Sequence, residues 1–136
     1  MTDYEILEHT ADIGIRAYGI NLTELFETAT RGLCSITGAW RAGDGQTVAI
    51  EVGPGDLGAV LVDWLSEVLY LQDAWDSIIA AVTVDGVSEE GARGKVVLAP
   101  RGDETLEGTA VKAITYHQLR VEHVDGRWIA EVYLDV

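Results

Sequence analysis

Three oxygen-donor groups at the two ends of the chain are the residues with the most evident chemistry. Asp12 lies in an early segment, and the sequence closes on Asp135 and Val136, where a terminal carboxylate would lie beside the Asp135 side chain. Oxygen-only ligation favours calcium, magnesium or manganese over zinc or copper. If folding brings Asp12 beside the chain end, these three groups would form a site for a hard divalent cation.

The segment that carries Asp12 alternates between polar and apolar residues as far as Tyr18. A period of two is typical of a strand with one buried face, so the sequence predicts a strand over residues 12–18. Gly14 lies on the same face as Asp12 and leaves room there for another group to come close. The alternative is structural: Asp12 caps a turn after His9-Thr10, and Gly14 marks a bulge.

The chain is strongly acidic. Among its 136 residues, 23 are acidic and nine are basic, which gives a formal net charge of −14 at pH 7. A phosphate backbone would be repelled, so direct and stable nucleic-acid binding is not expected. An acidic surface suits a basic protein partner or a cation, although solubility alone also explains such a charge.

The length fits a single domain over residues 1–136 with a sizeable core. Cys34 is the one cysteine, so an internal disulfide is excluded, and its apolar neighbours indicate a small core residue. The N-terminal segment lacks the features of a signal peptide, and no apolar run approaches the roughly 18 residues of a membrane span. We therefore expect a soluble, cytoplasmic protein with no membrane partner.

Two amphipathic helices are predicted between strands. Asn21 caps the first, which stops at Gly38, and Asp56 caps the second, whose apolar stripe runs over residues 57–69. Further strands are expected over residues 47–52, 78–84 and 95–99, the nearly continuous apolar run of 78–84 being a candidate central strand. The expected fold class is α+β in two layers: a mixed, mostly antiparallel sheet with both helices packed on one face.

A hairpin is predicted near the end of the chain. Asp125-Gly126 is a strong signal for a two-residue turn, which pairs Arg120 with Glu131 and Val121 with Ala130. This register is consistent on both faces, because opposite charges meet on one and apolar side chains meet on the other.

Extending the same register places Tyr116 opposite Asp135 and turns His117 toward the core. Lys112 lies on the Asp135 face if the strand stays regular. In so acidic a chain, Lys112 is expected to neutralise nearby acids or to reach a partner. A histidine on an apolar face is more often a core residue than a catalyst.

Three segments together resemble the archease family. These are EHTADIGI at residues 8–15, KAITYHQL at residues 112–119, and the ending from Trp128 to Asp135-Val136. The resemblance spans the chain, including its length and its two amphipathic helices, although residues 41–107 carry little of the family signature. The first motif and the ending are specific in combination.

The resemblance implies a helper protein for the RtcB-type RNA ligase, which works in tRNA splicing and RNA repair. Such a helper promotes guanylylation of the ligase and its multiple turnover, and is not itself an enzyme. The resemblance also implies a divalent cation, typically calcium, held by Asp12, Asp135 and Val136, and an activating role for Lys112. Manganese and magnesium are the alternative cations, and His117 receives no firm role.

Two other classes of function stay open from the sequence. One is an acidic, chaperone-like modulator of RNA-processing proteins. The other is a small metal-dependent phosphoesterase, although the sequence offers no convincing second metal cluster and no assigned general base.

Overall fold

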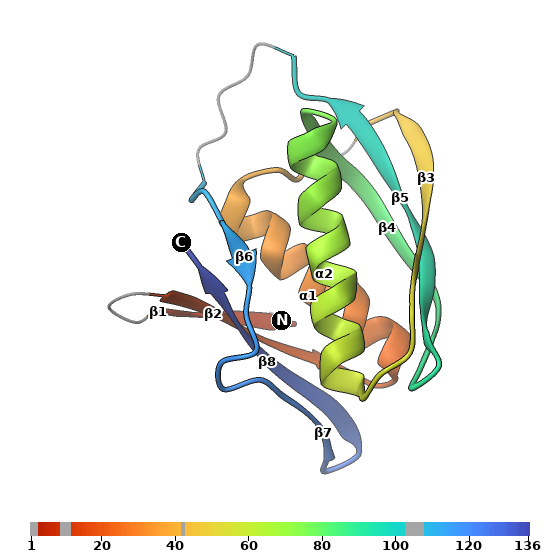
Figure 1. The fold of residues 1–136 in the computed structure, drawn as a ribbon, viewed down its shortest axis with the longest axis vertical. Coiled ribbons are helices and arrows are strands. Elements are labelled where there is room, and N and C mark those ends of the chain that lie inside the picture. Colours follow the sequence, from red (N-terminus) through yellow and green to blue (C-terminus); the bar gives the residue numbers. More distant parts are fainter. Residues whose placement is uncertain (1–2, 9–11, 42, 103–107) are drawn as a thin grey trace.

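The computed structural model describes residues 3–8, 12–41, 43–102 and 108–136. The described residues form two helices and eight strands, coloured along the chain in Figure 1. In chain order they are β1 (Tyr4–Glu8), β2 (Asp12–Gly19), α1 (Leu22–Thr37), β3 (Gln46–Val52), α2 (Leu57–Ala74), β4 (Ser77–Ser88), β5 (Gly91–Pro100), β6 (Ala113–Ile114), β7 (Arg120–Val124) and β8 (Arg127–Asp135).

The strands are divided between two sheets. One contains β1, β2, β8 and β6 in that order, with β7 also paired to β8, and the other has the order β3-β5-β4. Every ladder between these named strands is antiparallel. The α+β class and the mostly antiparallel pairing are therefore confirmed. The expected single sheet is replaced by two.

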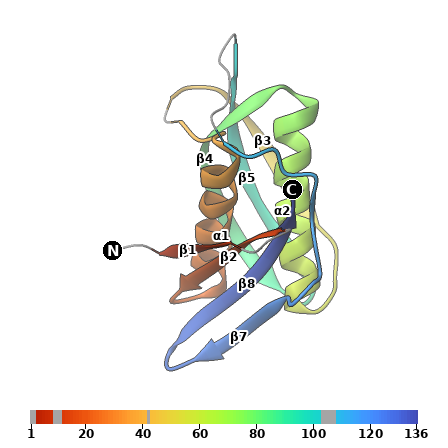
Figure 2. The ribbon, with the colours of Figure 1, turned by 90° about the vertical axis from the view of Figure 1, so that its left-hand side faces the viewer.

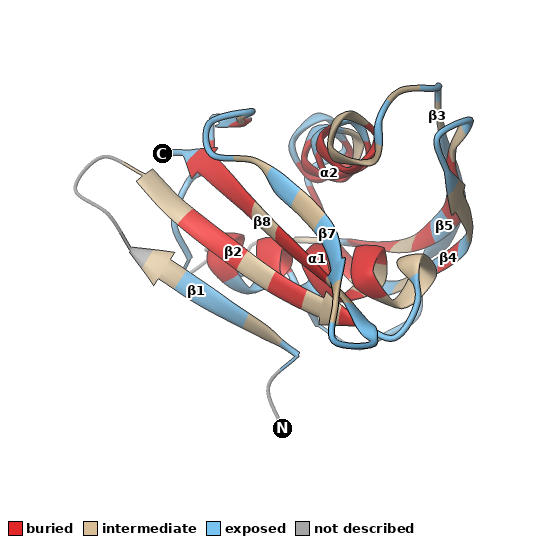
Figure 3. Cartoon of the chain, turned by 90° about the horizontal axis from the view of Figure 1, so that it is seen from below, coloured by how far each residue is buried: buried red, intermediate tan, exposed pale blue. Residues whose placement is uncertain are grey.

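Both helices lie between the two sheets. The expected arrangement, in which one sheet carries both helices on a single face, is therefore incomplete. Helix α1 contacts β1, β2 and β8 of the larger sheet and β4 of the smaller one, and α2 likewise contacts both sheets. Figure 3, in which the molecule is seen from below, shows this arrangement. Buried positions on α1 extend well beyond one stripe, from Leu25 and Phe26 to Thr30 and Cys34. A helix covered from two sides needs such a broad buried surface.

The predicted helix ends are confirmed. Asn21 Oδ1 accepts a hydrogen bond from the backbone N–H of Glu24 at 2.9 Å, and Asp56 Oδ1 accepts one from Ala59 at 2.9 Å. These contacts satisfy backbone donors that a helix N-terminus leaves unpaired. Gly38 ends α1 in the left-handed region at φ 77°, where the absence of a Cβ removes the usual steric penalty.

The smaller sheet corrects two strand predictions. The 78–84 segment, expected in a central position, belongs to the edge strand β4, and the centre is β5. Ile78, Ile79 and Val84 of β4 are buried, whereas Ala81 and Thr83 between them are exposed. The apolar run reflects cover from the helices rather than strands on both sides. Strand β5 is also longer than the predicted 95–99 segment.

The predicted hairpin register is confirmed along β7. Arg120 pairs with Glu131 and Val121 with Ala130, and Asp125 and Gly126 both have positive φ values, of 53° and 79°. Two consecutive residues with positive φ match the right-handed twist of the strands. Figure 2 shows this hairpin extending past the helices at one end of the molecule.

The extrapolated register before β7 is wrong. Asp135 pairs with Ala113 of β6 instead of Tyr116, because the chain turns between the two strands. At that turn, Gln118 has a φ of 53° and the Leu119 N–H donates to the Tyr116 carbonyl at 3.3 Å. His117 is consequently exposed and does not point into the core.

The core between helices and sheets is centred on large buried side chains. Trp64 and Phe26 are fully buried, and the Trp64 indole N–H donates to Thr30 Oγ1 at 2.9 Å, which joins α2 to α1. Trp64 also lies against Gly94 of β5, where an added Cβ would be 2.9 Å from the indole and 2.2 Å from the Thr83 carbonyl oxygen. Within the described residues, neither helix is long and apolar enough to cross a membrane.

Candidate functional site

Asp12 and Asp135 are direct partners in the ladder between β2 and β8. Asp12 is the first residue of β2 and Asp135 is the last of β8, so opposite ends of the sequence meet here (Figure 1). Directly opposed residues of an antiparallel pair have Cβ atoms about 4.5–5.5 Å apart. The two carboxyl groups therefore lie close together on one face, with Asp12 half-buried and Asp135 exposed. The predicted turn at His9-Thr10 lies outside the described residues.

The other two predicted site residues lie beside this pair. Val136 follows Asp135 directly, and its half-buried side chain packs against the core. The backbone N–H of Lys112 donates to the Asp135 carbonyl at 2.8 Å, while the Lys112 side chain is exposed. Within the described parts of the chain, no carboxylate lies at ion-pair distance from the Lys112 ammonium group. All four residues thus come together at one end of the larger sheet.

Gly14 makes room for a specific side chain, that of Tyr133. The two residues are ladder partners, and a Cβ on Gly14 would lie 2.7 Å from Tyr133 Cε1. The ring covers Gly14 on the face that also carries Asp12 and Asp135, because residues two apart on a strand share a face. The sequence predicts a close approach at Gly14 but does not identify Tyr133 as the group that approaches. Tyr133 lies two residues before Asp135, and this spacing could have placed it on the same face of the strand.

The same face carries a row of alternating charges, which we call the charge row: Glu5, Arg16, Glu131 and Arg120. These are successive ladder partners across β1, β2, β8 and β7. The Glu131 side chain is only 14% exposed and lies 3.3 Å from Arg16 and 3.6 Å from Arg120, measured between charged atoms. Alternating charges on directly opposed residues stabilise neighbouring strands.

Tyr133 is hydrogen-bonded to the charge row. Its hydroxyl donates to Glu131 Oε1 at 3.2 Å, next to the Arg16 contact with the same oxygen. Burial and the negative charge of Glu131 raise the pKa of Tyr133, with a smaller contribution from Asp12. The hydrogen bond to Glu131 likewise raises the pKa of Arg16. Tyr133 is therefore a neutral phenol at pH 7, between the charge row and the Asp12/Asp135 pair.

The donor set suits a hard cation by its chemistry. Two like charges placed directly opposite each other destabilise a strand pair, and a divalent cation between them removes that repulsion. Across the described residues, no group of three or more His, Cys, Asp or Glu side chains is placed to hold a metal ion. A cation here would need further oxygen ligands, from the protein or from water, to complete its coordination.

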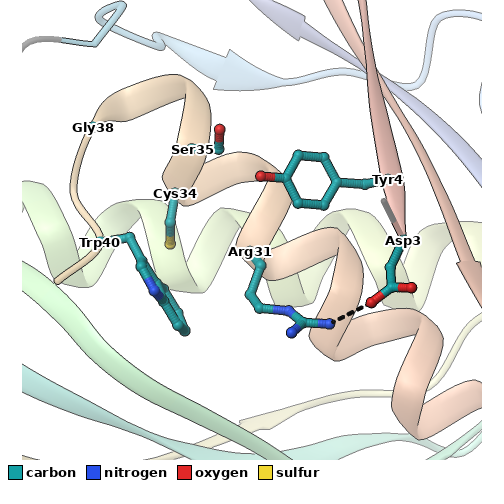
Figure 4. A pocket seen from close by; sticks show the side chains of 7 residues that line it. All are labelled: Asp3, Tyr4, Arg31, Cys34, Ser35, Gly38 and Trp40. Atoms are coloured by element: carbon teal, nitrogen blue, oxygen red, sulfur yellow. Dashed lines mark hydrogen bonds and ion pairs between the residues drawn. The ribbon is translucent and has the colours of Figure 1, made fainter. Parts of the chain in front are cut away.

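Cys34 is not suited to act as a nucleophile. Its thiol is fully buried, and burial raises its pKa to about 12 despite a hydrogen bond from Gln72 at 3.3 Å. A nucleophilic cysteine needs a partly exposed thiolate. Cys34 lies at the base of an open pocket of about 580 Å³ between the start of β1 and the end of α1 (Figure 4).

None of the predicted site residues lines that pocket. Figure 4 shows its walls: the rings of Tyr4 and Trp40, and the Arg31 guanidinium, which pairs with Asp3 at 3.4 Å. The described lining includes no histidine and no general base beside the thiol. The pocket therefore offers no nucleophilic constellation among its described residues.

Comparisons with known proteins agree with the sequence motifs. The model of the Archease protein family matches residues 4–136. The archease of Methanosarcina mazei is 34% identical over 139 residues, covering 98% of this chain and 95% of that protein. The archease of Pyrococcus furiosus is 37% identical over 144 residues and covers both proteins fully.

Solved structures show the same architecture. The solution structure of protein 1598 of Methanobacterium thermoautotrophicum matches with a TM-score of 0.74 and 29% identity, covering 100% of both chains. A Thermotoga maritima crystal structure, named as an archease and "possible chaperone", matches with a TM-score of 0.67 and 21% identity, covering 97% of this chain and 96% of that one. Since the family model and the relatives span nearly all residues, this chain belongs to the archease family.

Proposed function

We propose that this chain is an accessory protein that activates an RtcB-type RNA ligase by promoting guanylylation of the ligase and its multiple turnover. Such a ligase acts in tRNA splicing and RNA repair. The observation that carries the proposal is the meeting of Asp12, Asp135 and Lys112, drawn from separate motifs, at one end of the β2–β8–β6 sheet. Family membership supports an accessory role of this kind.

Asp12, Asp135 and the Val136 carboxylate are proposed to hold a divalent cation. Calcium is the expected ion, with manganese and magnesium as alternatives, because every donor is an oxygen. The bound cation would supply concentrated positive charge at the sheet end. The chain's own residues hold the two carboxylates opposite each other and keep the last residue of β8 fixed by the Lys112 N–H bond.

Lys112 is proposed to contact the ligase. Its ammonium group is exposed, and no described carboxylate neutralises it, which leaves a positive charge available to a partner's acidic group or bound phosphate. The backbone of the same residue is fixed to Asp135. A partner that engages Lys112 would therefore also face the carboxylate pair.

We propose no catalytic step on this chain itself. The reaction would take place on the ligase, and the buried Cys34 thiol is not placed to act as a nucleophile. The phosphoesterase alternative makes a different prediction: the isolated protein would hydrolyse phosphate esters in the presence of a divalent cation.

The test is guanylylation of the cognate RtcB-type ligase with GTP and manganese, with and without this protein. We expect faster labelling with the full chain, and loss of the increase with Asp12→Asn, with Lys112→Ala and with a variant lacking Val136. Lys95→Ala is the matched control. Lys95 is the other lysine of the chain, lies on β5 of the smaller sheet and pairs with Asp85 at 3.9 Å.

Two outcomes would contradict the proposal. If the guanylylation of an active ligase is no faster with the unaltered chain or with any variant, the proposed role in ligase activation is wrong. Equal losses from Lys112→Ala and Lys95→Ala would remove the specific role of Lys112 and indicate a general effect of net charge.

A chaperone-like modulator is the second candidate, favoured by the net charge of −14 and by the description of the Thermotoga maritima archease. An acidic surface can shield basic, RNA-binding proteins from association. Suppression of aggregation of unrelated basic RNA-processing proteins, retained by Asp12→Asn, would favour this candidate over ligase activation.

A further inference from the structure

We infer that Tyr133 is a positioning residue for the Asp12/Asp135 pair, holding the geometry in which the two carboxylates bind a divalent cation. The inference rests on the proposed cation site and deepens it, because it names the side chains that support the ligands. It concerns three side chains to which the motifs assign no role: Tyr133, Glu131 and Arg16.

Tyr133 is buried although it lies on the face of the sheet that points away from the core. Ile15 and Ala17 of β2, with Val132 and Leu134 of β8, line the face that packs on the core. Tyr133 lies on the opposite face, between the exposed Asp135 and the partly buried Glu131, yet only 4% of Tyr133 is accessible. Its ring must therefore lie along the sheet rather than project from it.

The second step is what holds the ring in that orientation. Gly14 provides a surface without a side chain, and the hydroxyl of Tyr133 donates to Glu131. Glu131 is itself fixed by Arg16 from β2 and Arg120 from β7. The charge row thus fixes the far end of the phenol across three strands.

The third step concerns the strand at the other side of β8. The Tyr133 carbonyl accepts hydrogen bonds from the N–H of Thr115 at 2.9 Å and from its hydroxyl at 3.0 Å. The His117 ring meets the Tyr133 ring edge-on, with 6.3 Å between centroids. These contacts fasten the chain that follows β6, the strand that begins next to Lys112.

The fourth step relates the ring to the ligands. Tyr133 lies two residues from Asp135 on β8, and its ring covers the position two residues from Asp12 on β2. It therefore fills the space beside the carboxylate pair that a side chain at position 14 would occupy. Outer-shell groups that orient ligands are worth about 10–100-fold in metal affinity, and Tyr133 would act as such a group by packing beside the carboxylate pair.

The test has two measurements on the isolated full chain. Titration calorimetry gives the affinity for calcium, and thermal unfolding without divalent cations gives the stability. Tyr133→Val removes the ring and should weaken calcium binding by about 10-fold. Tyr133→Phe keeps the ring over Gly14 but lacks the hydroxyl that donates to Glu131, so its affinity should fall less than that of Tyr133→Val. Gly14→Ala forces the ring to move and should also weaken binding.

The double variant Gly14→Ala with Tyr133→Val separates positioning from packing. Its added methyl group fills part of the vacated space, so thermal stability should recover in part relative to the single variants while calcium affinity stays low. Recovery of both properties would overturn the inference, because it would show that filled space alone suffices.

Two further results are decisive. Unchanged calcium affinity in Tyr133→Val would overturn the positioning role and leave the cation site intact. Absence of calcium binding by the unaltered chain would overturn the cation site and the inference together.

Discussion

Asp12 and Asp135 oppose each other directly across the β2–β8 ladder, although they belong to opposite ends of the sequence. Like charges in this relationship destabilise a strand pair, and the effect on directly opposed residues is on the order of 0.2–1 kcal/mol. The arrangement therefore carries an energetic cost in the absence of a cation. A cation that removes this repulsion should raise the stability of the protein, and that increase can be measured.

Asp12→Asn should have opposite effects with and without a cation. In chelator, we expect the variant to be as stable as the unaltered chain or more stable, by up to about 1 kcal/mol, because the repulsion is gone. Calcium at 100 times its dissociation constant should stabilise the unaltered chain by about 2.7 kcal/mol and Asp12→Asn far less. Urea unfolding under both conditions measures this.

The control for this prediction is Asp63→Asn, at an exposed position on α2. It removes the same charge and should keep the full response to calcium. Equal calcium responses in Asp12→Asn and Asp63→Asn would show that any stabilisation comes from general charge screening.

Thr30→Val should destabilise the protein by about 1–3 kcal/mol, because it leaves the buried Trp64 N–H without its acceptor. Thr28→Val is the matched control on the same helix. The Thr28 hydroxyl bonds to the Glu24 carbonyl, and Arg31 lies 3.4 Å away. Chemical denaturation followed by tryptophan fluorescence compares the two variants, and the Thr30 variant should lose more.

A double-mutant cycle makes the Thr30 prediction specific. In a Trp64→Phe background there is no indole N–H to satisfy, so Thr30→Val should cost less than in the unaltered chain. A cost that is the same in both backgrounds would place the effect in packing around Thr30 rather than in the hydrogen bond.

The raised pKa of Cys34 predicts that the protein loses stability at alkaline pH. Its pKa is about 12 in the folded protein against an ordinary value of 9.0, so between these values the unfolded chain loses a proton that the folded chain keeps. Stability due to this group is complete below pH 9 and declines as the pH rises toward 12, by up to about 4 kcal/mol. Cys34→Ala should show a smaller decline between pH 9 and 11 in urea unfolding.

The thiol also gives a direct chemical readout. At pH 8, an aromatic disulfide reagent should react with Cys34 slowly in the folded protein and rapidly in denaturant, because the thiol is buried. Fast reaction without denaturant, or identical alkaline slopes for Cys34→Ala and the unaltered chain, would contradict the assigned burial effect.

Local signals in the sequence predict the local structure well. Asn21 and Asp56 mark the helix starts because short polar side chains accept bonds from free backbone N–H groups. Asp125-Gly126 fixes the hairpin register because few other pairs tolerate two positive φ angles. Each of these features depends on residues within a few positions of one another.

The parts that sequence reasoning missed depend on distant contacts. The turn at Gln118 ends the extrapolated register, and its positive φ has no signal in a residue that rarely adopts this conformation. The strands form two sheets because each helix is covered by strands on two sides. The polar and apolar pattern of a single strand does not indicate which sheet the strand joins. The oxygen-donor chemistry and the family resemblance both single out Asp12 and Asp135, whereas the place of Tyr133 requires the β2–β8 register.

Glu27 protects the edge of the smaller sheet, and its loss should expose that edge. Its carboxylate accepts a hydrogen bond from the backbone N–H of Val84 on the edge strand β4 at 2.8 Å. An edge strand with unpaired backbone groups is a template for pairing with another chain. Glu27→Ala should cost about 1.5–3 kcal/mol, since a hydrogen bond to a charged group is lost, and should accelerate amide exchange at Val84.

Glu27→Gln distinguishes the hydrogen bond from the charge. Its amide oxygen can still accept from Val84, so it should retain most of the stability and slow exchange, although the bond is weaker without a charged acceptor. Concentration-dependent association of Glu27→Ala, absent in Glu27→Gln, would establish that the hydrogen bond to Val84, rather than the charge, guards the strand edge. Unchanged exchange at Val84 in Glu27→Ala would instead show that other groups cover this N–H, and the edge would need a different protector.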